Sequence, residues 1–237
     1  MTATDEARTT RLLLGIETSC DETAAAVVED GVRVRSSVVA TQHELHEEYG
    51  GVVPEIASRA HLERILPVVR RAIADAGIRL EDLDAVAVGH RPGLIGALLV
   101  GTSAAKGLAL ALDIPLVGVD HVHAHLVAGM LEREPPALPA LGLVASGGHS
   151  SIYLVEDPIH PRLLCRTIDD AIGEAFDKVA AMLDLGHPGG PAVERLAESG
   201  DPTAFTLPVA NLGRESLDFS FSGLKTAVLY AARGQPG

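Results

Sequence analysis

The sequence predicts an α/β protein made of two similar units in tandem. Three observations support this prediction. The order strand, polar turn, strand, strand, helix occurs over residues 11–76 and again over residues 141–184. Each copy begins with a short apolar run that ends in a turn of small, polar or acidic residues. With 237 residues, of which 47% are hydrophobic and 22% charged, the chain is long and apolar enough for two domains with cores.

The first copy continues beyond its helix with a strand, a helix and a strand. Its long helix is expected to begin near Pro54, which suits a first helical turn, and to end at Gly77. Pro67 lies inside it and predicts a kink or a break. The apolar stretch 94–119 is interrupted by charged residues and a proline, which favours a packed helix and strand over a membrane span. The predicted elements are strands at 11–17, 24–28, 32–39, 84–88 and 115–119 and helices at 54–76 and 94–112.

The second copy repeats this order in a shorter form. A mixed sheet that opens with three consecutive antiparallel strands and is flanked by helices is typical of a ribonuclease-H-like unit. Two such units in tandem characterise the actin-like ATPase superfamily, so we predict a first domain over residues 11–119 and an incomplete second domain over 120–237, which lacks a strand–helix–strand portion. The predicted elements are strands at 141–145, 151–155 and 163–167 and helices at 170–183, 192–199 and 224–233.

Composition narrows the functional classes. The chain has 19 basic and 32 acidic residues, and its net charge of −13 predicts that it does not bind nucleic acid strongly without partner chains. Its two cysteines do not suggest a disulfide framework. The first ten residues carry no apolar stretch of the kind found in signal peptides. A cytoplasmic location without membrane attachment is therefore expected.

Three histidines alternate in the run 120–125 (DHVHAH), directly after the apolar run 115–119, which is expected to be a short buried strand. Asp120 suits a helix N-cap, and on such a helix His121 and His125 share one face because they lie four residues apart. Two imidazoles on one face can bind one metal ion, although a metal site usually needs at least a third ligand. A surface helix with solvated histidines explains the same spacing equally well.

Several loops contain residue types that can bind a ligand. Backbone N–H groups of the turn 146–149 (SGGH) can point at an anion, but such a turn is more often only a hairpin. The loop 188–191 (PGGP) can lie against a flat ring, or simply join two helices. Asp177 can accept hydrogen bonds from ribose hydroxyls, or pair with Lys178. The polar turn 18–23 suits a phosphate or its metal ion, and equally well plain solvation.

Seven features of the sequence, taken in order, resemble the TsaD family, the tRNA N6-adenosine threonylcarbamoyltransferases. The resemblance extends from Leu12 to about Tyr230. Each feature alone is weak, but seven in the family's order are very specific. The features are 15–23 (GIETSCDET), 49–59 (YGGVVPEIASR), the histidine pair, 146–149 (SGGH), 173–178 (GEAFDK), 188–191 (PGGP) and 219–226 (FSFSGLKT).

The resemblance implies a reaction and its participants. The threonylcarbamoyl group of threonylcarbamoyl-AMP would be transferred to N6 of the adenosine next to the anticodon in tRNAs that read ANN codons. His121 and His125 would bind a metal, Fe²⁺ or zinc, and TsaB-like and TsaE-like proteins would be partners. No general base is apparent, so no catalytic residue is assigned. The residues that would contact the adenylate are Val144, Ala145, Ser146, Gly147, Gly148, Asp177, Gly190 and Glu194.

Two features depart from the family pattern. Arg91 stands where family members usually have the first glycine of Gly-Pro-Gly-Leu, and it places a long cation in a loop that glycine otherwise holds tight. Beyond Gly237 the family continues with a segment that supplies an Asn to the ligand and an Asp to the metal. The sequence is therefore interpreted as a truncated family member, for which weak metal binding and no turnover are expected.

Two other functions are considered. A TsaB-like paralogue, which acts as a non-catalytic dimerisation partner, shares the first domain, but such paralogues lack the metal site. A metallopeptidase usually carries His-Glu-x-x-His, and no glutamate lies between His121 and His125. The transferase is therefore the main hypothesis.

Overall fold

The computed structural model describes residues 10–186 and 188–234. The chain divides into two compact units between Pro135 and Pro136. This boundary lies sixteen residues after the predicted one at 119/120. The difference arises because helix α4 (His121–Val127) directly follows the last strand of the first sheet and packs on that sheet. The histidine pair therefore belongs to the first unit.

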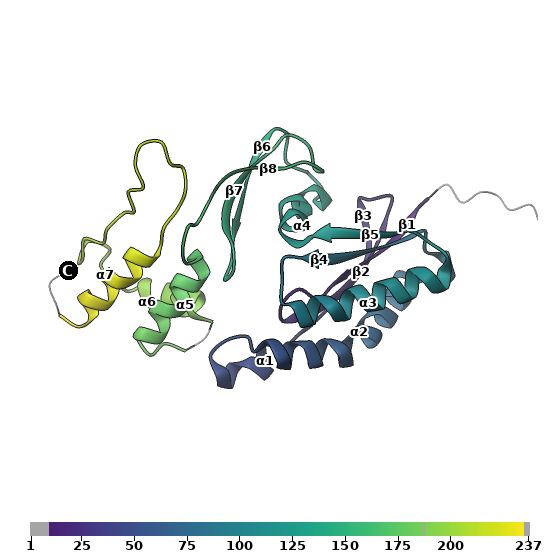
Figure 1. Ribbon diagram of the computed structural model, residues 1–237, viewed down its shortest axis with the longest axis horizontal. Helices are drawn as coiled ribbons and strands as arrows, with labels where there is room; N and C mark the ends of the chain where they lie inside the picture. The colour runs from purple at the N-terminus through teal and green to yellow at the C-terminus, as the bar shows by residue number, and fades with distance from the viewer. Residues whose placement is uncertain (1–9, 187, 235–237) are drawn as a thin grey trace, which may run out of the picture. The chain divides into compact units, whose positions relative to one another are not determined.

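A five-stranded mixed sheet forms the centre of the first unit, with strand order β3-β2-β1-β4-β5 (Figure 1). The first three strands form an antiparallel meander, β4 pairs parallel to β1, and β5 pairs parallel to β4. This is the ribonuclease-H-like arrangement that the sequence predicts. The strands are β1 (Leu12–Glu17), β2 (Glu22–Glu29), β3 (Arg33–Thr41), β4 (Ala85–Arg91) and β5 (Leu116–Asp120).

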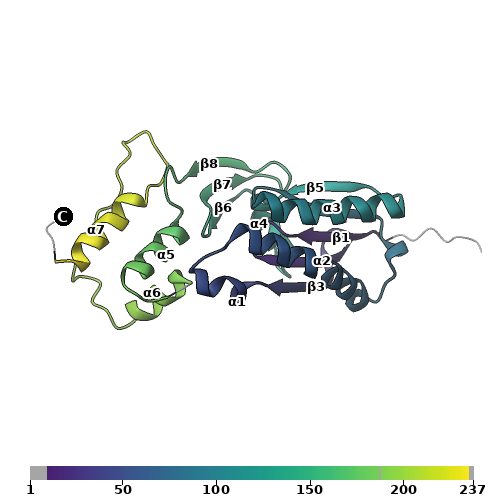
Figure 2. The ribbon, with the colours of Figure 1, turned by 60° about the horizontal axis from the view of Figure 1, so that its bottom comes forward.

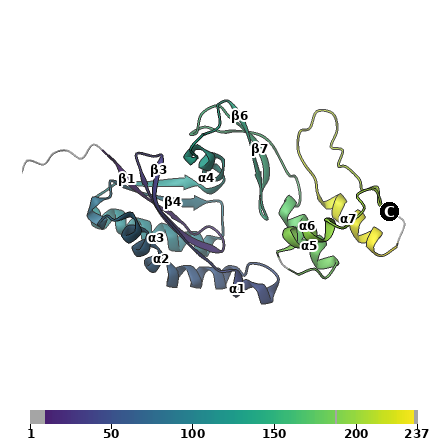
Figure 3. The same cartoon turned by 180° about the vertical axis from the view of Figure 1, so that it is seen from behind.

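Helices α2 (Pro54–Ala76) and α3 (Ile95–Leu112) cover one face of this sheet, and α4 lies on the other (Figure 3). Helix α2 runs through Pro67 as one helix, so of the predicted kink or break the break is wrong. The helix ends at Gly77, which has a φ of 67°. By length and composition α3 can cross a membrane, with a mean hydropathy of 1.7, a test that packed core helices also pass. The short helices are α1 (His43–His46), η1 (Glu47–Tyr49), η2 (Leu80–Asp82) and η3 (Ala128–Leu131).

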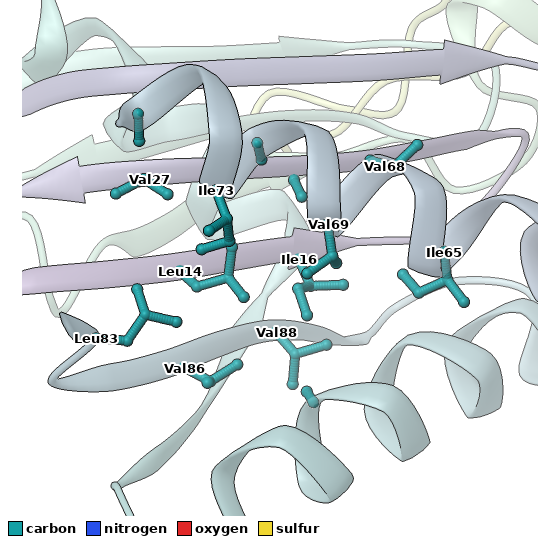
Figure 4. Packing of buried hydrophobic residues seen from close by; sticks show 14 of the residues in the cluster. Leu14, Ile16, Val27, Ile65, Val68, Val69, Ile73, Leu83, Val86 and Val88 are labelled. Carbon is teal, nitrogen blue, oxygen red and sulfur yellow. The ribbon is translucent and has the colours of Figure 1, made fainter. Parts of the chain in front are cut away.

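The hydrophobic core of the first unit lies between the sheet and these two long helices (Figure 4). Alternate residues of β1, among them Leu14 and Ile16, point toward α2, from which Val69 and Ile73 pack against them. Leu14 and Val86 are completely buried. Burying an aliphatic side chain of this size contributes roughly 1.5–3 kcal/mol. This packing fixes the strand ends that carry the candidate site.

The second unit opens with an antiparallel three-stranded sheet in the order β6-β7-β8. Helix α5 (Ile172–Met182) follows, and α6 (Gly189–Ala197) and α7 (Ser222–Ala232) pack on it (Figure 2). The order of three strands and a helix thus recurs as predicted. Within the described part of this unit, no strands correspond to β4 and β5. The strands are β6 (Ala140–Ala145), β7 (Ser150–Val155) and β8 (Arg162–Arg166).

Two neighbouring aspartates attach α7 to the rest of the second unit. Asp169 accepts a hydrogen bond of 2.8 Å from Ser222 Oγ at the start of α7. Asp170 forms ion pairs with Lys225 of α7, at 2.7 Å, and with Lys178 of α5, at 2.9 Å. Hydrogen bonds from these two lysines hold the pKa of Asp170 below its ordinary value. Helices α5 and α7 are therefore joined through one carboxylate.

Candidate metal centre and ligand-binding loops

Helix α4 begins at the end of β5 and presents two histidines on one face. The Asp120 side chain accepts hydrogen bonds from the backbone N–H groups of Val122, at 3.0 Å, and His123, at 3.2 Å, which confirms the predicted N-cap. The Nε2 atoms of His121 and His125 lie 3.1 Å apart, so the predicted convergence of the two rings is confirmed. Two nitrogens that bind one ion at about 2.1 Å lie roughly 3 Å apart. The spacing therefore fits a shared metal ion.

Glu17, at the end of β1, supports this pair and was not identified from the sequence. Its Oε2 lies 3.1 Å from Nδ1 of His121, and Ser19 Oγ lies 3.2 Å from the same nitrogen. A carboxylate that accepts the Nδ1–H of a histidine fixes the tautomer and directs the lone pair of Nε2 toward a metal. The available signal was an acidic residue at a strand end, inside the run 15–23 that resembles the family.

Burial, hydrogen bonds and neighbouring charges shift the pKa values of three side chains at this site. Burial raises the pKa of Glu17, but hydrogen bonds from His121 and Ser19 outweigh burial and hold that pKa below its ordinary value. The hydrogen bond to Glu17 raises the pKa of His121. Burial, and then the charge of His121, lower the pKa of His125. His125 therefore keeps its neutral, metal-binding form to lower pH than an exposed histidine does.

The chain supplies only part of a coordination sphere. Among residues 10–186 and 188–234, no group of three His, Cys, Asp or Glu side chains is placed to hold a metal ion. Two imidazole nitrogens with an outer carboxylate are nevertheless a donor set that suits zinc and iron. An ion bound here needs further ligands from water, substrate or another segment of the protein.

A cavity of about 330 Å³ adjoins His121 on the sheet face opposite α2 and α3. Glu17, His121 and Ala124 form part of its wall. A side chain at Gly89 would collide with the Glu17 carboxylate, so glycine there makes room for the group that orients His121. Small residues of three strands leave the remaining space open. They are Gly15, Ala24, Ala26, Ala87 and Gly89.

The polar turn between β1 and β2 uses most of its hydroxyl groups internally. Thr18 Oγ1 donates to the carbonyl of Ala97, at 2.9 Å. Thr23 Oγ1 lies 2.8 Å from Nδ1 of His61, whose Nε2 lies 3.0 Å from the carbonyl oxygen of Cys20. Thr18, Thr23 and His61 are completely buried. These side chains fix the turn to α2 and α3, so the hydroxyl groups of Thr18 and Thr23 are not available to a phosphate.

The turn 146–149 joins β6 to β7 in the second unit, as predicted. The N–H of Ser146 donates to the carbonyl of His149, at 2.8 Å, so it is not directed at an anion. This corrects the expectation that all the amides from 146 to 148 face a ligand. Gly173, at the start of α5, lies against the turn, and a Cβ there would come within 2.7 Å of the Gly147 nitrogen. Only glycine allows this close approach.

The other predicted ligand contacts lie in the same unit. Oδ1 of Asp177, on α5, accepts a hydrogen bond of 2.8 Å from the N–H of Gly189. This contact starts α6 at Gly189, so residues 189–191 are helical, and the expectation of a loop there is wrong. Gly190 and the exposed Glu194 lie on α6, close in sequence to that capped end. Val144 is buried, so only its backbone is available to a ligand.

Fold and site together define an α/β protein of the actin-like ATPase superfamily, with a histidine-based candidate metal centre at the carboxyl end of β5. This chain belongs to the TsaD family: the family model described as tRNA N6-adenosine threonylcarbamoyltransferase matches residues 33–233.

Curated relatives carry the same description. The tRNA N6-adenosine threonylcarbamoyltransferase of Trichlorobacter lovleyi is 60% identical over 225 residues, which are 95% of this chain and 66% of the relative. That of Symbiobacterium thermophilum is 59% identical over 226 residues, again 95% of this chain and 66% of the relative. The chain thus spans slightly less than two thirds of the length of these relatives.

Similarity to solved structures is weaker. YeaZ from Pseudomonas aeruginosa aligns with a TM-score of 0.44 and 26% identity, over 65% of this chain and 64% of that one. The ROK hexokinase from Thermus thermophilus aligns with a TM-score of 0.46 and 18% identity, over 82% of this chain and 70% of that one. We draw no functional conclusion from similarities of this size.

Proposed function

We propose that the protein is a metal-dependent tRNA N6-adenosine threonylcarbamoyltransferase. It would transfer the threonylcarbamoyl group from threonylcarbamoyl-AMP to N6 of the adenosine next to the anticodon. The observation that supports this most directly is the pair His121 and His125, with Nε2 atoms 3.1 Å apart, in a chain of the TsaD family. Fe²⁺ is the ion we propose, and zinc suits the same nitrogens.

In this proposal His121 and His125 hold the ion, and Glu17 orients His121. The bound ion supplies Lewis acidity toward the carbonyl group of the acyl-adenylate. The adenosine amine forms a bond to that carbonyl carbon while the bond to AMP breaks. No residue is assigned as the base that removes the proton of the amine.

The second unit would bind the adenylate. We propose that the backbone from Val144 to Gly148 contacts the phosphate side. The N–H group of Gly147 is the relevant donor, since the N–H of Ser146 donates to the carbonyl of His149 and that of Gly148 donates to Ser146 Oγ, at 3.4 Å. Asp177 and Gly190 would contact the adenosine side, with Glu194 nearby on α6.

Partner proteins are part of the proposal. A chain with a net charge of −13 is poorly suited to bind RNA alone, so TsaB-like and TsaE-like proteins are expected to assist. Four leucine and isoleucine side chains are exposed on α2 and α3, two helices that pack against each other, and exposed apolar side chains of this size can mark a protein interaction site. They are Leu62 (69% exposed), Leu66 (54%), Ile95 (76%) and Leu99 (57%). We propose this α2–α3 surface as the contact with the TsaB-like partner.

The function is tested by reconstitution. The protein, its partner proteins, threonylcarbamoyl-AMP and unmodified tRNA are combined, and modified adenosine is measured by mass spectrometry of the nucleosides. We expect turnover from a form that covers the full length of the relatives, and not from residues 1–237 alone. His121→Ala should reduce turnover at least about 100-fold, because one of the two chain ligands is lost.

His160→Ala is the matched control, because this histidine is 80% exposed and lies in the second unit. Absence of modified adenosine with the full-length form and all partners would contradict the transferase. Partner binding with no turnover and no bound metal would instead support the scaffold. Robust turnover by residues 1–237 would show that the expected loss of activity is wrong.

A further inference from the structure

Arg91 ends strand β4, next to the strand that leads into the histidine-bearing helix. In the parallel register of β4 and β5, Arg91 is the partner of Asp120, and His121 follows directly. Ligands of open α/β sheets bind at the carboxyl ends of adjacent strands. The guanidinium group therefore lies at the edge of the sheet where the candidate metal centre is built.

An ion pair orients this arginine without using all of its donors. Nε of Arg91 lies 3.4 Å from Oδ2 of Asp120, whose other oxygen caps α4. The Arg91 side chain remains 70% exposed. Among the residues that the structure describes, none accepts a hydrogen bond from the two terminal amino groups of Arg91. Asp120 thus holds Nε of Arg91 in place, while the two terminal amino groups face solvent.

The loop that follows Arg91 is fixed to the turn after β1. The N–H of Leu94 donates to the carbonyl of Ser19, at 2.8 Å, and a Cβ at Gly93 would collide with the Ser19 backbone. Ser19 Oγ is in turn 3.2 Å from Nδ1 of His121. The loop therefore stays tightly packed with arginine in place of the family glycine. This packing also reduces the entropy that Arg91 loses when it binds a ligand.

Most charged groups at this edge of the sheet are acidic, although Arg64 of α2 donates to the carbonyl of Thr41 at the end of β3. Glu17 ends β1, Glu22 begins β2 and Asp120 ends β5. Such a field repels a phosphate unless a cation offsets it. A guanidinium group binds phosphate through two parallel N–H bonds, which makes arginine better suited to this task than lysine.

We propose that Arg91 binds a phosphate group of the substrate beside the candidate metal centre. This inference rests on the proposed function, which offers two phosphate sources, the phosphoryl group of the acyl-adenylate and the backbone of the tRNA. The terminal amino groups of Arg91 bind the phosphate while Nε stays on Asp120. A glycine at this position has no donor of this kind, so the contact distinguishes this chain from relatives that carry the usual glycine.

The test compares Arg91→Gln with Arg59→Gln, an arginine that is 77% exposed and paired with Glu55 on α2. Both variants lose one exposed, ion-paired cation. AMP binding is measured by calorimetry, and binding of unmodified tRNA, with the partner proteins present, by fluorescence anisotropy over a range of salt. Arg91→Gln should weaken binding of at least one ligand about 5- to 10-fold, whereas Arg59→Gln should leave both unchanged.

The two sources give different results. A loss for AMP assigns the contact to the adenylate, whereas a loss confined to tRNA, with a salt slope lower by about 1, assigns it to the RNA backbone. Arg91→Lys should recover part of the loss because it keeps the charge without the fork. Equal affinities of the two glutamine variants for both ligands, or no binding by the unmodified protein, would overturn the proposal. These readouts need no turnover, so a failed transferase assay leaves them interpretable.

Discussion

A contact between two side chains 104 residues apart determines how His121 is presented. Glu17 accepts from Nδ1 of this ring, at 3.1 Å, and glycine at position 89 leaves the space that the carboxylate occupies. His125 lies one helical turn along, and its Nε2 faces that of His121. An ion bound here would therefore contact two imidazoles. Glu17 on strand β1 fixes the orientation of His121, and helix α4 fixes that of His125.

Glu17→Gln should weaken binding of Zn²⁺ or Co²⁺ about 10- to 100-fold, since an amide is a poorer acceptor for the Nδ1–H and fixes the tautomer less firmly. The measurement is competition with a chromophoric chelator. Glu22→Gln is the matched control, because it removes one exposed carboxylate from the neighbouring strand. Equal metal affinities of the two variants would show that Glu17 has no such role.

At the scale of elements, the start of α5 and the β6–β7 turn pack backbone against backbone. The N–H of Gly173 donates to the carbonyl of Ser146, at 3.2 Å, and an added Cβ would lie 2.7 Å from that same carbonyl oxygen. By contrast, a Cβ at Gly148 would meet nothing within 4 Å. Close packing therefore requires glycine at position 173, whereas position 148 has room for a Cβ.

Gly173→Ala should lower the free energy of unfolding by about 1–3 kcal/mol, because the helix or the turn must shift to relieve the collision. Gly148→Ala should change it by less than about 0.5 kcal/mol. Urea-induced unfolding followed by circular dichroism measures both. Indistinguishable midpoints would mean that the close approach of α5 to the turn is not tight in solution.

At the scale of the whole molecule, several large apolar side chains of α2 and α3 remain exposed, although both helices cover a core. Leu99→Lys should weaken association with a purified TsaB-like partner at least about 10-fold, because it places a charge within the proposed α2–α3 surface. Sedimentation of the mixed proteins measures the complex. Val209→Lys, at a site 91% exposed in the second unit, adds the same charge elsewhere and should have no effect. An intact complex with Leu99→Lys would exclude this surface.

Local patterns in the sequence predicted the elements and part of the site. Alternation and helical spacing predicted the two meanders and the long helices, and the meander with its flanking helices indicated a ribonuclease-H-like unit. The cap at Asp120 and the position of His121 and His125 on one helix face were predictable because both depend only on local helix geometry. The resemblance to the TsaD family was likewise visible in short runs of residues.

Tertiary packing determined what these patterns left open. The apolar strand β5 was expected to be buried, yet it lies at the sheet edge with Leu116 37% and Val117 47% exposed. The first unit extends to Pro135, beyond the predicted boundary, because α4 packs on β4 and β5. Glu17 and Arg91 could not be assigned to the candidate site from the sequence, because β1, β4 and β5 lie side by side only in the folded sheet. Local spacing along the sequence fixes which side chains share a face of one element, whereas the order of strands in a sheet depends on contacts between distant segments of the chain.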